Sequence, residues 1–117
     1  MTVLRIVADL LAPDPRAVAG FYRDLLGLEP VMDLGFIVTL ASDAPSHPQL
    51  SIMSEGGSDA EVPTLSIEVD DVDAAHARAS ELGIEIVYPL VDEPWGVRRF
   101  FVRDPGGRTL NILSHIR

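Results

Sequence analysis

Apolar and polar residues alternate over short stretches of the chain, which is the pattern typical of β-strands. Stretches of this kind lie at residues 3–11, 28–34, 35–42, 48–55, 64–69, 85–90, 98–103 and 109–113. Two further stretches, residues 13–27 and 70–83, repeat their apolar residues at helical spacing and predict helices. The predicted order is therefore β-α-β-β-β, and it begins again after a polar, Gly-containing connector at residues 55–63.

The two predicted helices have recognisable ends. In the first, Asp14 is suited to the N-cap, Pro15 to the first helical position and Gly27 to the left-handed residue past the end. The second begins after a pair of aspartates and ends at Gly83. The apolar face of the first helix is predicted to carry Val18, Phe21, Tyr22, Leu25 and Leu26.

The repeated order predicts the fold class. A βαβββ unit has a single helix, which covers only one face of its small sheet, so the other face needs a partner. We therefore expect an α+β fold in which tandem modules, about residues 1–57 and 62–117, form a curved, half-open mixed sheet with a concave cavity within one domain, 1–117. A ferredoxin-like fold is the competitor, but it needs one strand fewer per helix.

Composition narrows the possible partners. The chain has 117 residues, 47% of them hydrophobic and 23% charged, which predicts a folded domain. A net charge of −9 repels phosphate backbones and anionic lipids, so neither nucleic acid nor a membrane is expected as a partner. Arg5 and Asp9 interrupt the apolar start too early for a signal peptide, and we expect a cytoplasmic protein. With no cysteine, thiolate metal sites and cysteine nucleophiles are excluded.

Three segments carry a resemblance to a known family. They are the helix exit "FYRDLLGLEPV", the segment "IEVDDVDAAHARASELG" and the closing "PWGVRRFFVRDPGGRTLNIL". With the tandem β-α-β-β-β order, the chain resembles the vicinal oxygen chelate superfamily, which includes glyoxalase I, extradiol dioxygenases and bleomycin resistance proteins. The resemblance implies the glyoxalase/bleomycin resistance fold, a cavity and a homodimer. It does not fix a reaction, because the superfamily contains both metalloenzymes and metal-free binders.

The resemblance also implies where a metal would be held. Metal-dependent members take one inward ligand, a His, Glu or Gln, from the first and fourth strands of each module. In this chain the corresponding residues are Val7, Ser51, Thr64 and Asn111. Because a valine, two hydroxyls and an amide lack the anionic oxygens or imidazoles that divalent ions need, we expect no metal and no other cofactor. The three histidines, in a loop, on the second helix and near the chain end, are not expected to replace them.

Strand parity predicts which side chains line the cavity. On the fifth strand Leu65, Ile67 and Val69 form the apolar face toward the helix, so the alternate residues face the cavity. Applied to the other strands, and with the loop tryptophan added, this predicts a ligand-binding cavity lined by Val7, Asp9, Ser51, Met53, Thr64, Ser66, Glu68, Trp95, Arg99, Phe101 and Asn111.

Four of these residues have predicted roles. We expect Arg99 to pair with Glu68, since an unpaired buried charge is costly, although Arg99 also suits a ligand carboxylate. Trp95 suits a stacking surface at the cavity rim or a structural plug between the modules. Asp9 and Glu68 are the candidate general bases if the chain is an enzyme without a metal.

Three functions fit these observations. The favoured one is a metal-free protein of the resistance type that binds or sequesters a small organic molecule. The alternative is a lyase, isomerase or oxygenase of the same fold, with relocated metal ligands or metal-independent acid–base chemistry. The third is a dimerisation module whose cavity is filled by its own side chains.

Overall fold

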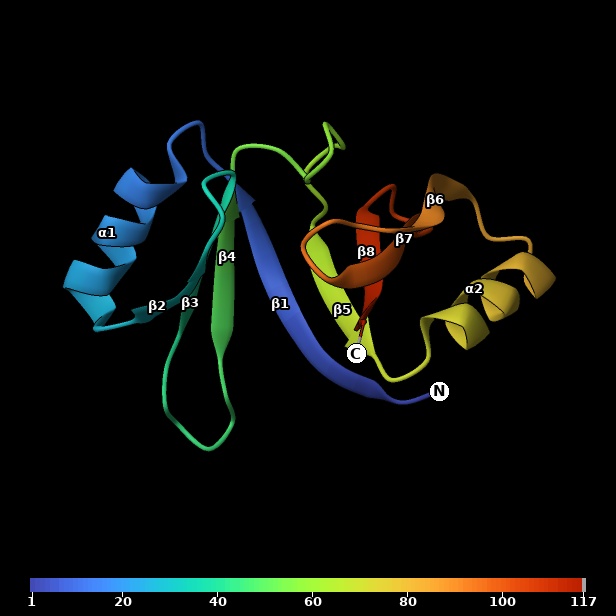
Figure 1. The fold of residues 1–117 in the computed structure, drawn as a ribbon, viewed down its shortest axis with the longest axis horizontal. Coiled ribbons are helices and arrows are strands. Elements are labelled where there is room, and N and C mark those ends of the chain that lie inside the picture. The colour runs from blue at the N-terminus through green and yellow to red at the C-terminus, as the bar shows by residue number, and fades with distance from the viewer. Residues whose placement is uncertain (117) are drawn as a thin grey trace. The chain divides into compact units, whose positions relative to one another are not determined.

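The computed structural model describes residues 1–116 and contains two β-α-β-β-β modules in succession (Figure 1). The first module consists of β1 (Val3–Leu11), α1 (Pro15–Leu26), β2 (Glu29–Asp33), β3 (Ile37–Ala41) and β4 (Gln49–Met53). The second consists of β5 (Leu65–Val69), α2 (Val72–Glu81), β6 (Ile86–Asp92), β7 (Val97–Arg103) and β8 (Thr109–His115). The predicted element order and the α+β class are confirmed, and the ferredoxin-like alternative is excluded by the strand count.

The chain divides into two compact units. We call residues 7–62 the N-terminal unit, and residues 1–6 with those from Pro63 onward the C-terminal unit. Strand β1 contributes its first four residues, 3–6, to the C-terminal unit and its last five, 7–11, to the N-terminal unit. The prediction that both modules make a single domain stays a prediction.

The N-terminal unit has its strands in the order β2-β3-β4-β1. The β1–β4 pair is parallel, whereas β2–β3 and β3–β4 are antiparallel, so the sheet is mixed. Helix α1 packs on one face of these strands. The buried core there consists of Ala12, Ala19, Val38, Leu40 and Ile52, with Val18 and Tyr22 of α1 packed against it.

Helix α1 begins and ends at the predicted residues. The Asp14 carboxylate accepts a hydrogen bond of 3.3 Å from the backbone N–H of Ala17, Pro15 occupies the first turn, and Gly27 adopts a φ of 69°. The predicted apolar face is wrong in part. Phe21, Leu25 and Leu26 are exposed, because the strands cover only the narrower stripe that contains Val18, Ala19 and Tyr22.

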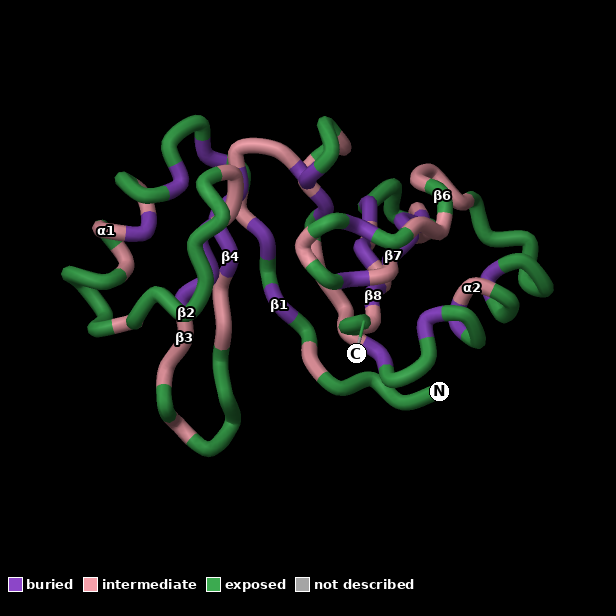
Figure 2. The backbone as a smooth tube through the Cα atoms, in the orientation of Figure 1, coloured by how far each residue is buried: buried purple, intermediate pink, exposed green. Residues whose placement is uncertain are grey.

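The C-terminal unit has its strands in the order β1-β5-β8-β7-β6. Strands β5 and β8 are parallel, and β8–β7 and β7–β6 are antiparallel. The core between this sheet and α2 consists of Val69, Val72, Ala75, Ala79, Phe100 and Val102. In Figure 2 these buried segments run along β7, β8 and one side of α2.

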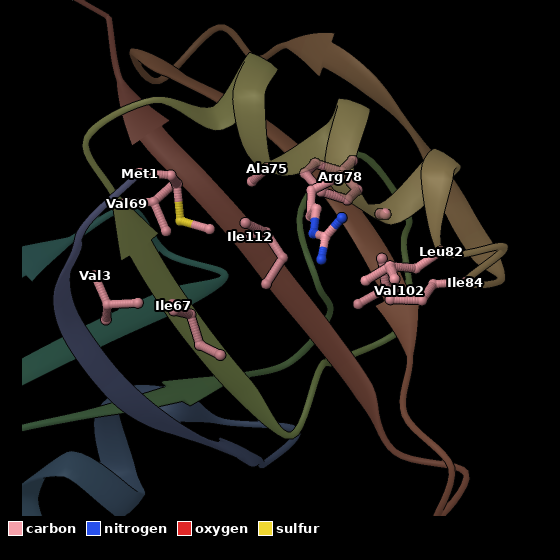
Figure 3. Close-up of a pocket in the computed structure, with 12 residues that line it drawn as sticks. Met1, Val3, Ile67, Val69, Ala75, Arg78, Leu82, Ile84, Val102 and Ile112 are labelled. Carbon is pink, nitrogen blue, oxygen red and sulfur yellow. The ribbon is translucent and has the colours of Figure 1, made fainter.

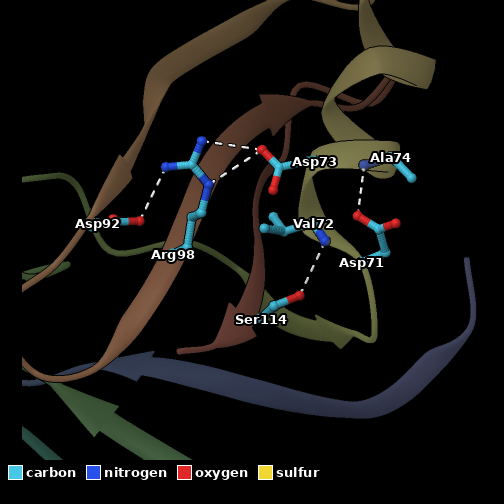
Figure 4. Close-up of polar contacts among 7 residues, drawn as sticks. All are labelled: Asp71, Val72, Asp73, Ala74, Asp92, Arg98 and Ser114. Carbon is cyan, nitrogen blue, oxygen red and sulfur yellow. Dashed lines mark hydrogen bonds and ion pairs between the residues drawn. The ribbon is translucent and has the colours of Figure 1, made fainter. Parts of the chain in front are cut away.

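Backbone and side-chain hydrogen bonds fix the start of α2 on the sheet (Figure 4). The Asp71 carboxylate caps the helix by accepting a hydrogen bond of 3.0 Å from the N–H of Ala74. The Ser114 hydroxyl on β8 accepts a hydrogen bond of 3.1 Å from the N–H of Val72. It also donates a hydrogen bond of 2.7 Å to the carbonyl of Val69 on β5. One hydroxyl thus joins α2 to both central strands of the unit.

An exposed ion-pair network lies beside this junction. Arg98 of β7 contacts Asp73 of α2 at 3.0 Å and Asp92 of β6 at 3.0 Å (Figure 4). The hydrogen bond to Asp73, followed by that to Asp92, raises the pKa of Arg98 above its usual value. Neither helix among residues 1–116 has the length and apolar character that a bilayer crossing requires.

Candidate functional site

The face of the C-terminal sheet opposite α2 carries a row of polar and aromatic side chains. Residues paired across neighbouring strands have their side chains on the same face. In one row across β5, β8 and β7, Ser66 pairs with Asn111 and Asn111 with Phe101. In the next row on the same face, Glu68 pairs with Leu113 and Leu113 with Arg99. The alternate residues of the same strands, among them Phe100, Val102 and Val69, pack on α2. The structure therefore brings five of the predicted cavity residues onto one face: Ser66, Glu68, Arg99, Phe101 and Asn111.

A buried ion pair lies on this face. Two nitrogens of Arg99 contact the same carboxylate oxygen, Oε2 of Glu93: Nη2 lies 2.6 Å and Nε 2.8 Å from it. The Arg99 and Glu93 side chains are only 3% and 5% exposed. The Tyr88 hydroxyl donates a third bond of 2.9 Å to the same oxygen. Because both charges are buried together, each supplies the counter-charge that the other needs.

Aromatic rings surround the Arg99 guanidinium. Its central carbon lies 4.9 Å from the ring centre of Tyr88, 4.9 Å from that of Trp95 and 4.8 Å from that of Phe101. These distances are within the range of cation–π attraction. The Trp95 ring therefore contributes to the arginine's packing in this unit, and its proposed stacking on a ligand stays a prediction.

The predicted Arg99–Glu68 pair is wrong. Glu93 takes the place of Glu68 because the turn after β6 folds the carboxylate back over β7. In that turn the N–H of Glu93 donates 2.8 Å to the carbonyl of Val97, and Gly96 adopts a φ of 91°. Sequence reasoning missed Glu93 because it lies in a turn, outside the strand alternation that assigned the other side chains.

Glu68 has two other partners. Its carboxylate lies 3.1 Å from Nε of Arg5 on β1 and 2.7 Å from Nδ1 of His115 on β8. Its side chain is 16% exposed, whereas that of His115 is 49% exposed. His115 was predicted as a tail residue. Strand β8 extends to it, two residues beyond the predicted end, and this brings the imidazole beside Glu68.

Asn111 has a buried polar atom without a hydrogen-bond partner among the described residues. Its Nδ2 donates 3.1 Å to the Ser66 hydroxyl. Its Oδ1 is buried and has no hydrogen-bond partner in the part of the chain that the structure describes. A buried acceptor without a partner is costly, by about 1–3 kcal/mol. The sequence indicated this buried amide, because Asn111 interrupts an otherwise apolar stretch within the predicted strand of residues 109–113.

Thr64 lies apart from this group. It precedes the first residue of β5 and is exposed, and its backbone N–H donates 2.8 Å to the carbonyl of Thr109. The residue opposite Asn111 is Ser66, and the assignment of Thr64 to the cavity stays a prediction.

The other predicted residues lie in the N-terminal unit. Asp9 pairs with Ser51, which pairs with Thr39. The Ser51 and Thr39 hydroxyls are 2.8 Å apart, and all three residues are buried. Val7 and Met53 are buried as well. These side chains lie opposite the face that packs on α1, which is formed by alternate residues such as Ile52 and Leu40.

The donors do not fit a divalent metal. Among residues 1–116, no three His, Asp or Glu side chains gather closely enough to hold an ion. On the C-terminal face, Glu68 is held by Arg5 and His115, and Glu93 by Arg99. This leaves the Asn111 amide and the Ser66 hydroxyl, which are neutral ligands of low affinity for such ions.

Comparison with known proteins places the chain in a family. The Glyoxalase/Bleomycin resistance protein/Dioxygenase superfamily matches residues 3–112. The chain belongs to this superfamily. An uncharacterized protein of Mycobacterium bovis is 34% identical over 86 residues, covering 71% of this chain and 55% of the relative. The chain thus spans about half the length of the curated relatives it matches.

Solved structures share the fold. A Legionella pneumophila protein described as NAD-dependent benzaldehyde dehydrogenase superposes with a TM-score of 0.79 and 21% identity, covering 95% of this chain and 99% of its own. A superfamily member from Vibrio splendidus superposes with a TM-score of 0.70 and 22% sequence identity, covering 97% of this chain and 99% of its own. Streptomyces coelicolor methylmalonyl-CoA epimerase superposes with a TM-score of 0.70 and 18% sequence identity, covering 99% of this chain and 100% of its own. These likenesses show the fold and no particular activity.

Proposed function

We propose that the chain binds a small organic molecule on the face formed by Ser66, Glu68, Phe101 and Asn111, without a metal ion. Oδ1 of Asn111 carries the proposal. It is a buried acceptor with no partner among the described residues, and a ligand that donates an N–H or O–H to it would remove the cost of burying it. Trp95 and Tyr88, which are partly exposed and pack around Arg99 with the fully buried Phe101, add the apolar surface that small-molecule sites use.

The charges on this face indicate which ligands fit. Arg99 is neutralised by Glu93, and Arg5 lies against Glu68. The chain as a whole carries a net charge of −9. A neutral or cationic ligand meets less repulsion than an anion under these conditions. We propose a neutral or cationic molecule with at least one hydrogen-bond donor, bound by a homodimer. A cytoplasmic location stays a prediction from the sequence.

A thermal-shift screen of small neutral and cationic organic molecules tests this function, with Trp95 fluorescence as a second readout. We expect hits whose affinity falls at least tenfold in Asn111→Leu, because leucine keeps the branched shape of the side chain and has no acceptor. The matched control is Ile112→Val, which changes the next residue of β8, on the opposite face. Ligands that bind wild type and Asn111→Leu equally well would disprove the site.

The Glu68–His115 contact favours a second candidate, a metal-independent isomerase or lyase. A carboxylate 2.7 Å from Nδ1 orients the ring and leaves Nε2 of the half-exposed imidazole available as a base. His115 would take a proton from the carbon next to a carbonyl and return it. Deuterium exchange into carbonyl compounds, followed by NMR, should be lost in His115→Gln and reduced in Glu68→Gln. Exchange that survives His115→Gln would reject this candidate.

A further inference from the structure

The C-terminal unit contains an apolar pocket on the α2 side of its sheet, opposite the face of the proposed function. Its volume is about 250 Å³. Side chains from β5, β7, β8 and α2 converge on it (Figure 3). The lining includes Ile67, Val69, Ala75, Ala79, Leu82 and Val102, and Arg78 is the one lining residue with a charged side chain among the described residues.

The pocket results from small residues on α2. Both helices begin with an aspartate cap, Asp14 and Asp71, so positions can be compared by counting from the cap. Eight residues on, α1 has Tyr22 packed against its core, whereas α2 has Ala79. Four residues on, α1 has Val18 and α2 has Ala75. Helix α2 therefore lacks the ring and the branched side chain with which α1 packs against its own core.

An unfilled apolar space beside a protein core is a candidate site for an apolar ligand. Protein interiors are packed as densely as organic crystals, with few voids larger than a water molecule. A space lined by aliphatic and aromatic side chains does not hold water well, and an apolar cavity of about 150 Å³ is known to bind benzene. The present pocket is larger, and it is partly open to solvent.

Arg78 lines the pocket with the hydrocarbon part of its side chain, and its guanidinium is exposed to solvent next to the pocket. Its Nη1 lies 3.1 Å from Oε2 of Glu81, one turn along α2. Both side chains are more than 60% exposed, and exposed pairs of this kind contribute little to stability. A ligand carboxylate at the pocket mouth can therefore take the place of Glu81 on the guanidinium, which binds carboxylates in a planar fork.

We propose that this pocket binds an aliphatic carboxylate, with its chain under α2 and its carboxylate on Arg78. The proposal is independent of the face around Asn111. Titration of the full chain with butanoate, hexanoate and octanoate, followed by NMR or calorimetry, tests it. Burial of each methylene is expected to lower Kd about fourfold, so octanoate should bind much more tightly than butanoate.

Substitutions on α2 locate the ligand. Ala79→Leu fills the pocket and should abolish octanoate binding, whereas Ala77→Leu, the same change at an exposed position of α2, should leave it unchanged. Ala75→Val is a smaller filling change that should weaken binding if Ala79→Leu fails to fold. Arg78→Gln should weaken octanoate binding about tenfold or more and leave the binding of neutral octanol unchanged.

Several results would overturn the proposal. They are no dependence of Kd on chain length, equal binding by wild type and the filled-pocket variants, or loss of binding in Asn111→Leu, which would place the ligand on the other face. A second copy of the chain covering the pocket would also overturn it. In that case Ala79→Leu would change the sedimentation coefficient of the protein, and Ala77→Leu would not.

Discussion

Arg99 and Glu93 form an ion pair in which two guanidinium nitrogens contact one carboxylate oxygen, at 2.6 and 2.8 Å. The pair is almost fully buried and is covered by three aromatic rings. It therefore belongs to the interior of the C-terminal unit, and the two residues depend on each other for their charge balance.

Removing one partner of this pair should be strongly destabilising. Glu93→Gln leaves the Arg99 charge buried without its counter-charge, so we expect the free energy of unfolding to fall by about 3–5 kcal/mol. Glu81→Gln, in an exposed pair, is the control and should cost less than about 1 kcal/mol. Urea denaturation measures both. The double variant Arg99→Met with Glu93→Gln should lose less than the sum of the single losses, and additive losses would contradict the coupling.

The stability of the protein should fall in acid partly through Asp104. Backbone hydrogen bonds from Arg108 and Gly106, each 2.9 Å, hold the pKa of this carboxyl below its usual value. A lowered folded-state pKa contributes stability above the unfolded value of about 3.9, and this contribution is lost as the pH falls through the folded pKa.

Asp104→Asn should therefore be less sensitive to acid. Between pH 6 and pH 3 its unfolding temperature is expected to fall less than that of wild type, because asparagine has no proton to take up. Thermal unfolding at several pH values measures the difference. Parallel curves for the two proteins would show that Asp104 does not contribute.

Loss of the Ser114 hydroxyl should loosen α2. Ser114→Ala leaves the N–H of Val72 and the carbonyl of Val69 without this partner, so a loss of about 1–3 kcal/mol in the free energy of unfolding is expected. Amide exchange should increase in α2 more than in α1. Ser80→Ala, at an exposed position of the same helix, is the control, and an equal loss in both variants would contradict the role of Ser114.

Truncation of two adjacent aromatic residues of α1, Tyr22 and Phe21, should lower the free energy of unfolding by very different amounts. Tyr22 is partly buried against the core, so Tyr22→Ala should cost about 2–3 kcal/mol. Phe21 is 59% exposed, so Phe21→Ala should change the unfolding free energy by less than about 1 kcal/mol. If the loss from Phe21→Ala instead grows with protein concentration, a second copy covers this helix face in a homodimer.

The sequence predicted the features that depend on local chemistry. Asp14, Pro15 and Gly27 marked the ends of α1, and alternation assigned Phe101 to the face opposite the helix, where the structure has it. The partner of Arg99 was missed, because a turn that folds back over a strand leaves no periodic signal.

Two further errors have a common cause. Helical spacing identified which residues of α1 are apolar, but the width of the stripe that the strands cover is set by tertiary packing, so Phe21 and Leu25 were misplaced. The pocket under α2 likewise depends on the volumes of Ala75 and Ala79 against the sheet. Alternation and helical period give the direction of a side chain, and they do not measure how well it fills space.

Strand β1 is divided between the two units, with residues 3–6 in one and 7–11 in the other. Because side chains alternate with a period of two, one residue inserted near its middle would reverse the orientation of every side chain on one side of the insertion. Buried Val7 and Asp9 would then exchange places with their neighbours, while residues 3–6 stayed in phase. Evolution should therefore tolerate insertions and deletions in the 55–63 connector far more readily than within this strand.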